Sequence, residues 1–391
     1  MTHRYDAIVV GARCAGAATA MLLARAGLRV LLADRAAPGT DTLSTHALMR
    51  GGVLQLTRWG LLDGVVAAGT PAITRTSFDY GCQATTVTIR ASAGVSALYA
   101  PRRTVLDPLL AEAAEQAGAE VAFGFAVTGV HRDGQGRVCG VTGRDGLGRS
   151  RHAYAPLVIG ADGLSSTVAE AVGATVTGRG RHASAFWLTY VTGPSNQGYR
   201  WFYRPGASFG LIPTNDGATC VFGGLPAAGF RAPARGARWQ ALLDMFTGAG
   251  LDETADELRS AAPVSPVRGW PGVPNTRRAA CGPGWALVGD AGYYKDPIGT
   301  HGITQALRDA QILADAVVAG YGGAGPVADA LARYERLRDG LSAGLFAATD
   351  AVAAHDWDLD TLQELLRRLS SEMSREVDFL SEVGRITTNS K

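Results

Sequence analysis

Glycines near the N-terminus have the spacing of a phosphate-binding loop. Residues 9–16 read VVGARCAG, with glycines at the outer positions of the G-x-G-x-x-G pattern. Such glycines let the backbone approach a dinucleotide pyrophosphate, which the amides of the next helix bind. Arg13 replaces the central glycine, so its guanidinium is predicted to contact a phosphate; the alternative is a solvent-exposed arginine. The predicted contacts of this loop are Gly11, Ala12, Arg13, Cys14, Ala15 and Gly16.

The elements that must position this loop are clear from the pattern. Residues 6–10 form an apolar run that ends at Gly11, and residues 15–26 are rich in helix formers and stop at Gly27. A second apolar run, 28–34, ends in Asp34, which is followed by Arg35. Strand, glycine turn, helix, strand and acid form a dinucleotide-binding unit, with the acid placed to bind a ribose hydroxyl.

Two later apolar runs also end in glycine and aspartate. Residues 157–168 read LVIGADGLSSTV, and residues 286–297 read ALVGDAGYYKDP. The second continues as P-I-G-T-H-G over residues 297–302 and then as a helical pattern. The N-terminal amides of that helix would stabilise negative charge on a ligand.

Together these three segments resemble the FAD fingerprints of the aromatic-hydroxylase (p-hydroxybenzoate hydroxylase-like) superfamily of monooxygenases. That superfamily also includes geranylgeranyl reductases and flavin halogenases. The resemblance extends from Asp6 to about Ala319. It implies an α/β fold with a Rossmann-like FAD-binding domain of the glutathione-reductase type, an inserted antiparallel β-sheet substrate domain and C-terminal helices. The expected FAD-binding parts are 1–71, 101–181 and 271–325, the expected substrate parts are 72–100 and 182–270, and the C-terminal helices are 326–391.

The resemblance also assigns residues to the cofactor. Arg103 matches an arginine that opens a helix and touches FAD, and Val127 matches a strand beside the adenine. Ala169 stands where the family has an arginine, so contacts to NAD(P)H are expected to differ. The remaining residues expected around FAD are Thr45, His46, Asp162, Gly163, Gly289, Asp290, Gly299, Gly302 and Ile303.

Three residues of the last motif are candidates for catalysis. Pro297 is expected to face the C4a edge of the flavin, where oxygen reacts in monooxygenases. His301 and Tyr293 are the candidates for proton transfer. A loop histidine without such a role is the alternative for His301. Lys295, the only lysine besides Lys391, is expected to anchor the loop.

Residues 182–270 contain short aromatic and β-branched segments bounded by Gly, Pro and Asn, which predicts an antiparallel sheet. Its aromatic residues either line a substrate pocket or form the core of the sheet. Arg200 and Arg204 are interpreted either as solvated arginines or as partners of an acidic substrate. The aromatic residues in question are Phe186, Trp187, Tyr190, Trp201, Tyr203 and Phe209.

The composition of the chain limits the partners and the cellular compartment that we expect. The net charge of +2 gives no reason to expect a nucleic-acid partner. The five scattered cysteines argue against disulfides and zinc and for a reducing compartment. Because no apolar run is long enough to span a bilayer, a cytoplasmic protein without membrane contact is expected, as a monomer or homodimer.

The resemblance implies a single-component monooxygenase in bacterial secondary metabolism. NAD(P)H, a transient co-substrate, would reduce FAD, and O2 would hydroxylate or epoxidise an electron-rich small organic substrate through a C4a-hydroperoxide. The first alternative is an alkene reductase of the geranylgeranyl type. A flavin halogenase is disfavoured because no W-x-W occurs, and a non-redox flavoprotein is a further alternative.

Overall fold

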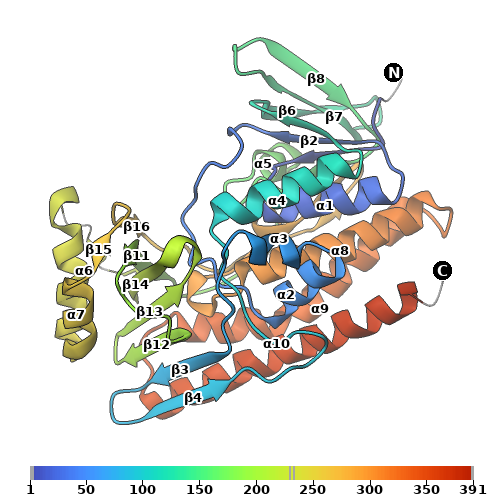
Figure 1. Cartoon of the computed structure of the whole chain (residues 1–391). Coiled ribbons are helices and arrows are strands. Elements are labelled where there is room, and N and C mark those ends of the chain that lie inside the picture. Colours follow the sequence, from blue (N-terminus) through green and yellow to red (C-terminus); the bar gives the residue numbers. More distant parts are fainter. Residues whose placement is uncertain (1–3, 229, 232–233, 389–391) are drawn as a thin grey trace.

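A six-stranded sheet carries the glycine motifs in the computed structural model, which describes residues 4–228, 230–231 and 234–388 (Figure 1). Its strands are parallel apart from the edge strand β18, and each of the inner strands ends at, or one to three residues before, a glycine or aspartate of the motifs. The carboxyl ends of parallel strands meet at one edge, so the motifs converge there. The strand order is β18(Cys281–Gly282), β19(Trp285–Leu287), β9(Val158–Gly160), β1(Ala7–Val10), β2(Val30–Asp34) and β5(Glu120–Phe123).

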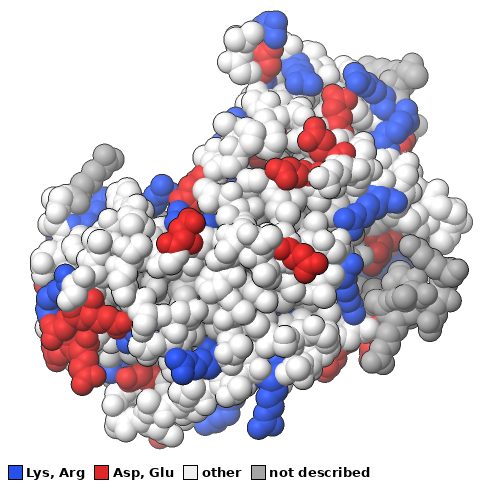
Figure 2. Space-filling view, in the orientation of Figure 1, with Lys and Arg blue, Asp and Glu red and all other residues white. Residues whose placement is uncertain are grey.

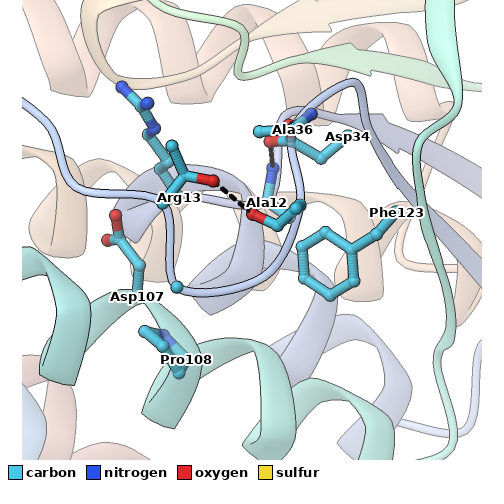
Figure 3. A pocket seen from close by; sticks show the side chains of 10 residues that line it. Ala12, Arg13, Asp34, Ala36, Asp107, Pro108 and Phe123 are labelled. Carbon is cyan, nitrogen blue, oxygen red and sulfur yellow. Dashed lines mark hydrogen bonds between the residues drawn. The ribbon is translucent and has the colours of Figure 1, made fainter.

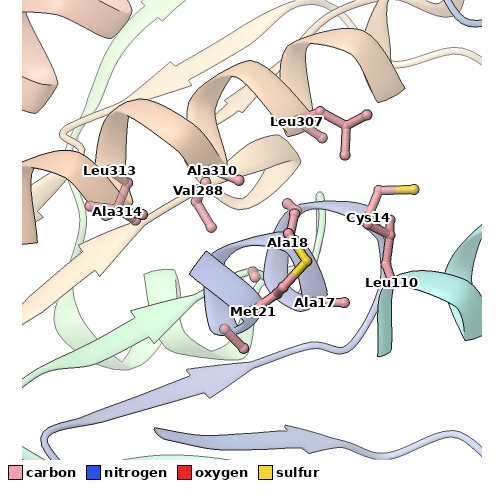
Figure 4. Packing of buried hydrophobic residues seen from close by; sticks show 14 of the residues in the cluster. Cys14, Ala17, Ala18, Met21, Leu110, Val288, Leu307, Ala310, Leu313 and Ala314 are labelled. Carbon is pink, nitrogen blue, oxygen red and sulfur yellow. The ribbon is translucent and has the colours of Figure 1, made fainter. Parts of the chain in front are cut away.

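Helices cover one face of this sheet. Small residues of α1(Cys14–Arg25), such as Ala17 and Ala18, face Ala310 and Ala314 of α8(Gly302–Tyr321), as Figure 4 shows. Helix α4(Arg103–Gln116) packs against the opposite side of α1. Alanine at these contacts lets the helix axes approach closely at native packing density. The N-termini of α1 and α8 are thereby fixed relative to each other.

The other face of the six-stranded sheet carries smaller elements. A three-stranded antiparallel sheet packs there through a cluster that includes Phe125 and Val141. The second three-stranded sheet connects the region after α5 to the loop that precedes α8. These elements are β6(Ala126–Arg132), β7(Val138–Arg144), β8(Ser150–Tyr154), α5(Thr167–Val172), β10(Val176–Arg179), β17(Thr276–Arg278) and β20(Tyr293–Tyr294).

A second large sheet joins segments that are far apart in sequence. Strand β3(Arg75–Asp79) pairs in parallel with β12(Tyr199–Arg204), so residues near 75–88 extend the sheet formed by residues near 184–270. Apart from that pairing the sheet is antiparallel. Its other strands are β4(Ala84–Thr88), β11(Ser184–Thr192), β13(Ala207–Pro213), β14(Ala218–Pro226), β15(Ala262–Pro263) and β16(Arg268–Trp270).

The two faces of this second sheet bury different aromatic side chains. Trp187 and Phe209 point to the face covered by α6(Arg238–Gly248) and α7(Asp252–Arg259). Tyr190 and Trp201 point to the opposite face, toward the rest of the molecule. This alternation follows from the two-residue period of a strand. The six aromatic residues therefore form core on both faces of the sheet rather than one pocket.

Both arginines of β12 have acidic partners within the protein. Arg200 lies 2.7 Å from Glu257 on α7, and Arg204 lies 2.9 Å from Asp79 on β3. The interpretation of these arginines as solvated side chains is therefore wrong. The same pairings leave neither guanidinium free for an acidic substrate.

The C-terminal helices run along the underside of the molecule in Figure 1. Helix α9(Val327–Val352) packs on α8, and α10(Leu359–Thr388) packs on α9 and on α2(Arg50–Arg58), which precedes α3(Leu62–Ala67). The predicted fold class, an α/β protein with an added β-sheet domain and C-terminal helices, is confirmed. Over the described ranges we find no helix long and apolar enough to cross a bilayer.

On the face shown in Figure 2, positive side chains are scattered rather than gathered into a stripe. The densest acidic group on that face lies over α7, where Asp252, Glu253 and Asp256 are exposed. The face as a whole therefore carries both positive and negative side chains, as expected for a chain whose formal charge is nearly balanced.

Candidate functional site

The loop between β1 and α1 requires glycine at two positions. Gly11 has a φ of 106°, and a Cβ there would lie 2.5 Å from the carbonyl oxygen of Ala161. A Cβ at Gly16 would lie 1.8 Å from the carbonyl oxygen of Gly11. Helix α1 begins without any side chain capping its amides. The amides at this helix start can therefore bind an anionic ligand.

A pocket opens beside this loop (Figure 3). Asp34, at the end of β2, accepts hydrogen bonds from the backbone amides of Ala12 (2.6 Å) and Ala36 (2.7 Å). Phe123 lies on the same side of the pocket, and Asp107 and Pro108 of α4 lie opposite. The carboxylate is thus held in place at the position expected for the ribose-binding acid.

Of three further residues predicted to contact the cofactor, only Arg13 lines this pocket. Arg13 lines it but is exposed, and its guanidinium donates to the hydroxyl of Thr42 at 2.9 Å. Arg35 is exposed and does not line the pocket. Val127 packs in the cluster beneath the small sheet, whereas Phe123 contributes the apolar wall. A phosphate contact by Arg13 remains a prediction.

Arg103 is placed at the start of α4, facing α1. Its guanidinium lies 2.9 Å from Asp107, whose carboxylate also accepts the thiol of Cys14 at 3.2 Å. Burial, opposed in part by Arg103, raises the pKa of Asp290 to about 6. Arg103 thus links the glycine loop to the aspartate that is expected to bind the ribityl chain.

Asp162, which is predicted to lie near FAD, also stabilises the turn after β9. It accepts the hydroxyl of Ser166 and, at 3.1 Å, the amide of Val168. The serine in turn caps α5 by accepting the amide of Ala169. Gly163 has a φ of 80° with open space around its Cα. The backbone after β9 therefore stays accessible while Asp162 holds the turn.

The segment before α8, residues 289–301, is here called the flavin loop. It contains η3(Gly289–Ala291), β20 and η4(Pro297–Gly299). Asp296 accepts the amides of Ser184 (2.6 Å) and Ile298 (2.9 Å), which ties the loop to β11. Thr300 has a φ of 48°, a conformation that non-glycine residues seldom adopt and that often marks functional loops.

The start of α8 combines an open end with buried neighbours. Gly302 is exposed with open space around it, although His301 and Thr304 are buried. Gly299 packs against Thr349 of α9, where a Cβ would lie 3.0 Å from the hydroxyl oxygen. Ile303 is half-buried beside Gly302. The start of the helix is therefore open and has no side-chain cap, so its N-terminal amides remain available to a ligand.

His301 belongs to a buried polar network. Its Nδ1 lies 2.8 Å from Nζ of Lys295, and its Nε2 lies 3.3 Å from Oε1 of Glu376 on α10. Burial and the charge of Lys295 lower the pKa of His301 to about 4, so its imidazole is neutral at pH 7. Lys295, expected to anchor the loop, is buried, and it contacts the buried His301 of the same loop.

Tyr293 faces away from the open end of α8. Its hydroxyl donates to the carbonyl of Ser342 on α9 at 3.3 Å, and its ring stacks on Phe346. Burial raises the pKa of the phenol well above its ordinary value. This geometry fits packing of the loop better than proton transfer.

Another buried histidine lies between the two large sheets. His46, with a φ of 64°, contacts the hydroxyl of Tyr190 through Nε2 and stacks on its ring. The guanidinium carbon of Arg102 lies over the Tyr190 ring, 3.9 Å from the ring centroid. Within the described chain the Nδ1 atom of His46 has no hydrogen-bond partner. Thr45 precedes it and is half-buried.

These observations fit a bound FAD. The glycine loop admits no side chain, Asp34 is held for a ribose, and the amide end of α8 is open. Asp290 and Arg103 are half-buried and lie close enough to interact electrostatically. Sequence reasoning missed Asp296 and Glu376, because their partners are distant in sequence, and it also missed Asp107, although Arg103 lies one helical turn before it. Only that spacing and the position of Asp296 beside the glycine motif offered a signal.

Comparison with known proteins agrees with this geometry. The profile of a family described as FAD binding domain matches residues 4–348. A probable electron transfer flavoprotein-quinone oxidoreductase, YdiS, of Escherichia coli is 28% identical over 85% of this chain and 81% of its own length. A digeranylgeranylglycerophospholipid reductase of Methanocella arvoryzae is 29% identical, with 88% and 86% covered.

An oxygenase is also among the similar proteins. A 12-dehydrotetracycline 5-monooxygenase/anhydrotetracycline 6-monooxygenase of Streptomyces rimosus is 28% identical, with 95% of this chain and 73% of that protein covered. The solved structure of pqsL, a probable FAD-dependent monooxygenase from Pseudomonas aeruginosa, superposes with a TM-score of 0.78 at 21% identity. That structure covers 95% of this chain and is itself fully covered, which establishes the shared fold.

Proposed function

The chain belongs to the FAD binding domain family of oxidoreductases, and we propose that it is a single-component monooxygenase. In this proposal NAD(P)H is the transient reductant and O2 the oxidant. Substrate, O2, NAD(P)H and a proton give the oxygenated substrate, NAD(P)+ and water. The substrate is an electron-rich small organic molecule. The tetracycline-modifying relative supports a place in secondary metabolism.

The observation that carries this proposal is the burial of the flavin loop against the second sheet. Asp296 joins the loop to β11, and Ile298 lies in the same apolar cluster as Tyr190 and Trp201. Oxygen transfer requires a site from which water is excluded, because water breaks down the reactive oxygen intermediate before it meets the substrate. A loop packed against aromatic side chains meets that requirement.

The roles of the chain's own residues follow from their positions. The amides of α1 bind the pyrophosphate, Asp34 accepts a ribose hydroxyl, and Arg103 neutralises charge near Asp290. The amides at the start of α8 stabilise negative charge at the flavin ring. Asp296 holds the loop, and the half-buried Pro297 beside it borders the reacting face. When bound, FAD supplies the acceptor for hydride and the activation of O2.

A second candidate is an alkene reductase. The coverage of the digeranylgeranylglycerophospholipid reductase, 88% of this chain and 86% of that protein, supports it. A reductase would use the same bound FAD but would return hydride to a carbon–carbon double bond. It would have no use for O2.

One experiment separates these candidates. The FAD-loaded protein is reduced anaerobically with NADH or NADPH while flavin absorbance is followed, and then ¹⁸O2 is admitted with aromatic or prenyl compounds present. A product that gains one ¹⁸O atom supports the monooxygenase. A product that gains two hydrogens without oxygen supports the reductase. A flavin that neither donor reduces, with or without these compounds, overturns NAD(P)H dependence.

A further inference from the structure

A buried group of charged side chains lies beneath the start of α8 and has no part in the proposal above. It contains Lys295 and His301 next to the flavin loop, Arg308 and Asp309 on α8, and Glu376 on α10. Each of these residues is at most 6% exposed. Burial of ionisable groups on this scale costs free energy unless they are paired or functional.

Lys295 lacks the partner that a buried ammonium ordinarily has. Among the residues that the structure describes, it forms no ion pair; its nitrogen contacts the neutral His301 at 2.8 Å and lies 5.5 Å from the ring centroid of Tyr293. Burial and the charge of Arg308 lower the pKa of Lys295 to about 7, despite the nearby Glu376, Asp309 and Asp290. Its protonation can therefore respond to a further charge near neutral pH.

The contacts of His301 fix the position of its proton. When Lys295 is protonated its ammonium can only donate, so Nδ1 of His301 then accepts from Lys295 and the ring hydrogen resides on Nε2. Nε2 lies 3.3 Å from Oε1 of Glu376, but the two atoms do not form a hydrogen bond, and neither has a hydrogen-bond partner among the described residues. Although burial favours the neutral acid, Arg308 at 2.8 Å lowers the pKa of Glu376. An ionised carboxylate orients the imidazole, which presents a lone pair to the lysine.

We propose that Glu376, His301 and Lys295 form a charge relay, in which the carboxylate orients the imidazole, the imidazole contacts the lysine, and Lys295 gains a proton from solvent when the bound FAD is reduced. The proposal rests on the redox function of the flavin loop. His301 is the N-cap residue of α8, so the relay ends where the helix amides stabilise added negative charge. A new negative charge there favours the ammonium form of Lys295.

The proton balance of this step is closed. NAD(P)H transfers two electrons and one proton to FAD as hydride, and the amine of Lys295 takes one proton from solvent. The ammonium then offsets the added negative charge. When O2 is reduced, Lys295 gives this proton back, and it enters the water that the reaction releases. The net reaction still consumes one proton, as the proposed stoichiometry requires.

The composition of the chain makes the lysine directly observable. Only Lys295 and Lys391 are lysines, so protein labelled with ¹³C at the lysine ε-carbon gives two signals, and Lys295→Met assigns them. The pH titration of the Lys295 signal is recorded in the oxidised and the dithionite-reduced FAD complex. We expect its pKa to rise by one unit or more on reduction, which is a tenfold or larger fall in the acid dissociation constant of the ammonium. An identical pKa in both redox states overturns the relay.

Variants of Lys295, His301 and Glu376 provide a second test of the relay. Proton uptake on photoreduction near pH 7 is expected to be larger in the wild type than in Lys295→Met by up to about half a proton per two electrons, because a lysine with a pKa of about 7 is already half protonated at that pH. His301→Gln and Glu376→Gln are expected to reduce the redox-linked pKa shift, provided thermal melting shows them folded. Arg200→Gln, which removes a distant ion-paired arginine, is the matched control and should behave as the wild type. Equal proton uptake in wild type and Lys295→Met contradicts the relay.

The two proposals can fail separately. A redox-linked shift of Lys295 without ¹⁸O incorporation overturns the monooxygenase and supports the relay. Incorporation of ¹⁸O with an unshifted Lys295 overturns the relay and supports the monooxygenase.

Discussion

The two ends of the candidate cofactor site are built in opposite ways. At the ribose and pyrophosphate end, one continuous segment, residues 7–34, provides the strands, the glycine turn, the helix and the acid. At the flavin end, the loop is held by Ser184 of β11, Ser342 of α9 and Glu376 of α10. The first end depends on backbone geometry and the second on side chains contributed by distant elements.

This difference determines how each end responds to change. Backbone amides carry no net charge to titrate, so the first end should be sensitive to steric bulk and insensitive to pH. The flavin end contains interdependent buried charges. Removal of one member leaves another unpaired, so this end should respond to charge and pH.

The largest expected effect comes from bulk at the first end. Gly16→Ala places a methyl group 1.8 Å from the Gly11 carbonyl oxygen, so the loop must deform. We expect FAD affinity to fall by a hundredfold or more, about 3 kcal/mol. Isothermal titration of apoprotein with FAD measures this loss. Gly134→Ala, where the added methyl meets open space, is the control. Unchanged affinity in Gly16→Ala would contradict the backbone account.

The next effect is the loss of a buried charge at the second end. Glu376→Gln removes the partner of Arg308 and His301, and we expect the free energy of unfolding to fall by about 3 kcal/mol. Denaturant unfolding at pH 7 measures it. Glu364→Gln, an exposed position on the same helix, should change stability little. Equal stabilities of the two variants would show that the network does not stabilise the fold.

The pH dependence of stability should also distinguish the two ends. The folded-state pKa of His301, about 4, lies below its ordinary value, so the unfolded chain binds the extra proton first as pH falls. The wild type should therefore lose stability between about pH 6.5 and pH 4, and His301→Gln should lose about 2 kcal/mol less over that range. Denaturant unfolding at a series of pH values checks this. Parallel profiles for wild type and His301→Gln would disprove it.

The smallest effect is expected at Arg13. Its side chain is exposed and contacts Thr42, so any phosphate contact is screened by solvent. We expect Arg13→Gly to weaken FAD binding about threefold at low salt, below 1 kcal/mol, with a difference that shrinks as salt rises. Titrations at two ionic strengths measure it. A hundredfold loss would instead make Arg13 a principal ligand of the phosphates.

The sequence by itself determined the first end of the site. Residues 7–34 interact mostly with their own neighbours, so hydrophobic period, glycine position and the acid after β2 suffice to predict strand, turn, helix and pocket. The same local logic located Asp162 and Asp290 at strand ends. The α/β fold class followed from those motifs together with the family resemblance.

Only the tertiary structure decided what surrounds the flavin loop. Glu376 lies 75 positions after His301 (376 − 301 = 75) in an amphipathic helix, where a glutamate ordinarily faces solvent. It is buried because Gly51 of α2 leaves room: a Cβ there would lie 3.1 Å from its carboxylate. The pairing of Arg200 with Glu257, and the burial of aromatic side chains on both faces of the second sheet, also depend on the tertiary structure. Charge pairing across distant elements depends on which surfaces meet, and local sequence pattern does not encode that.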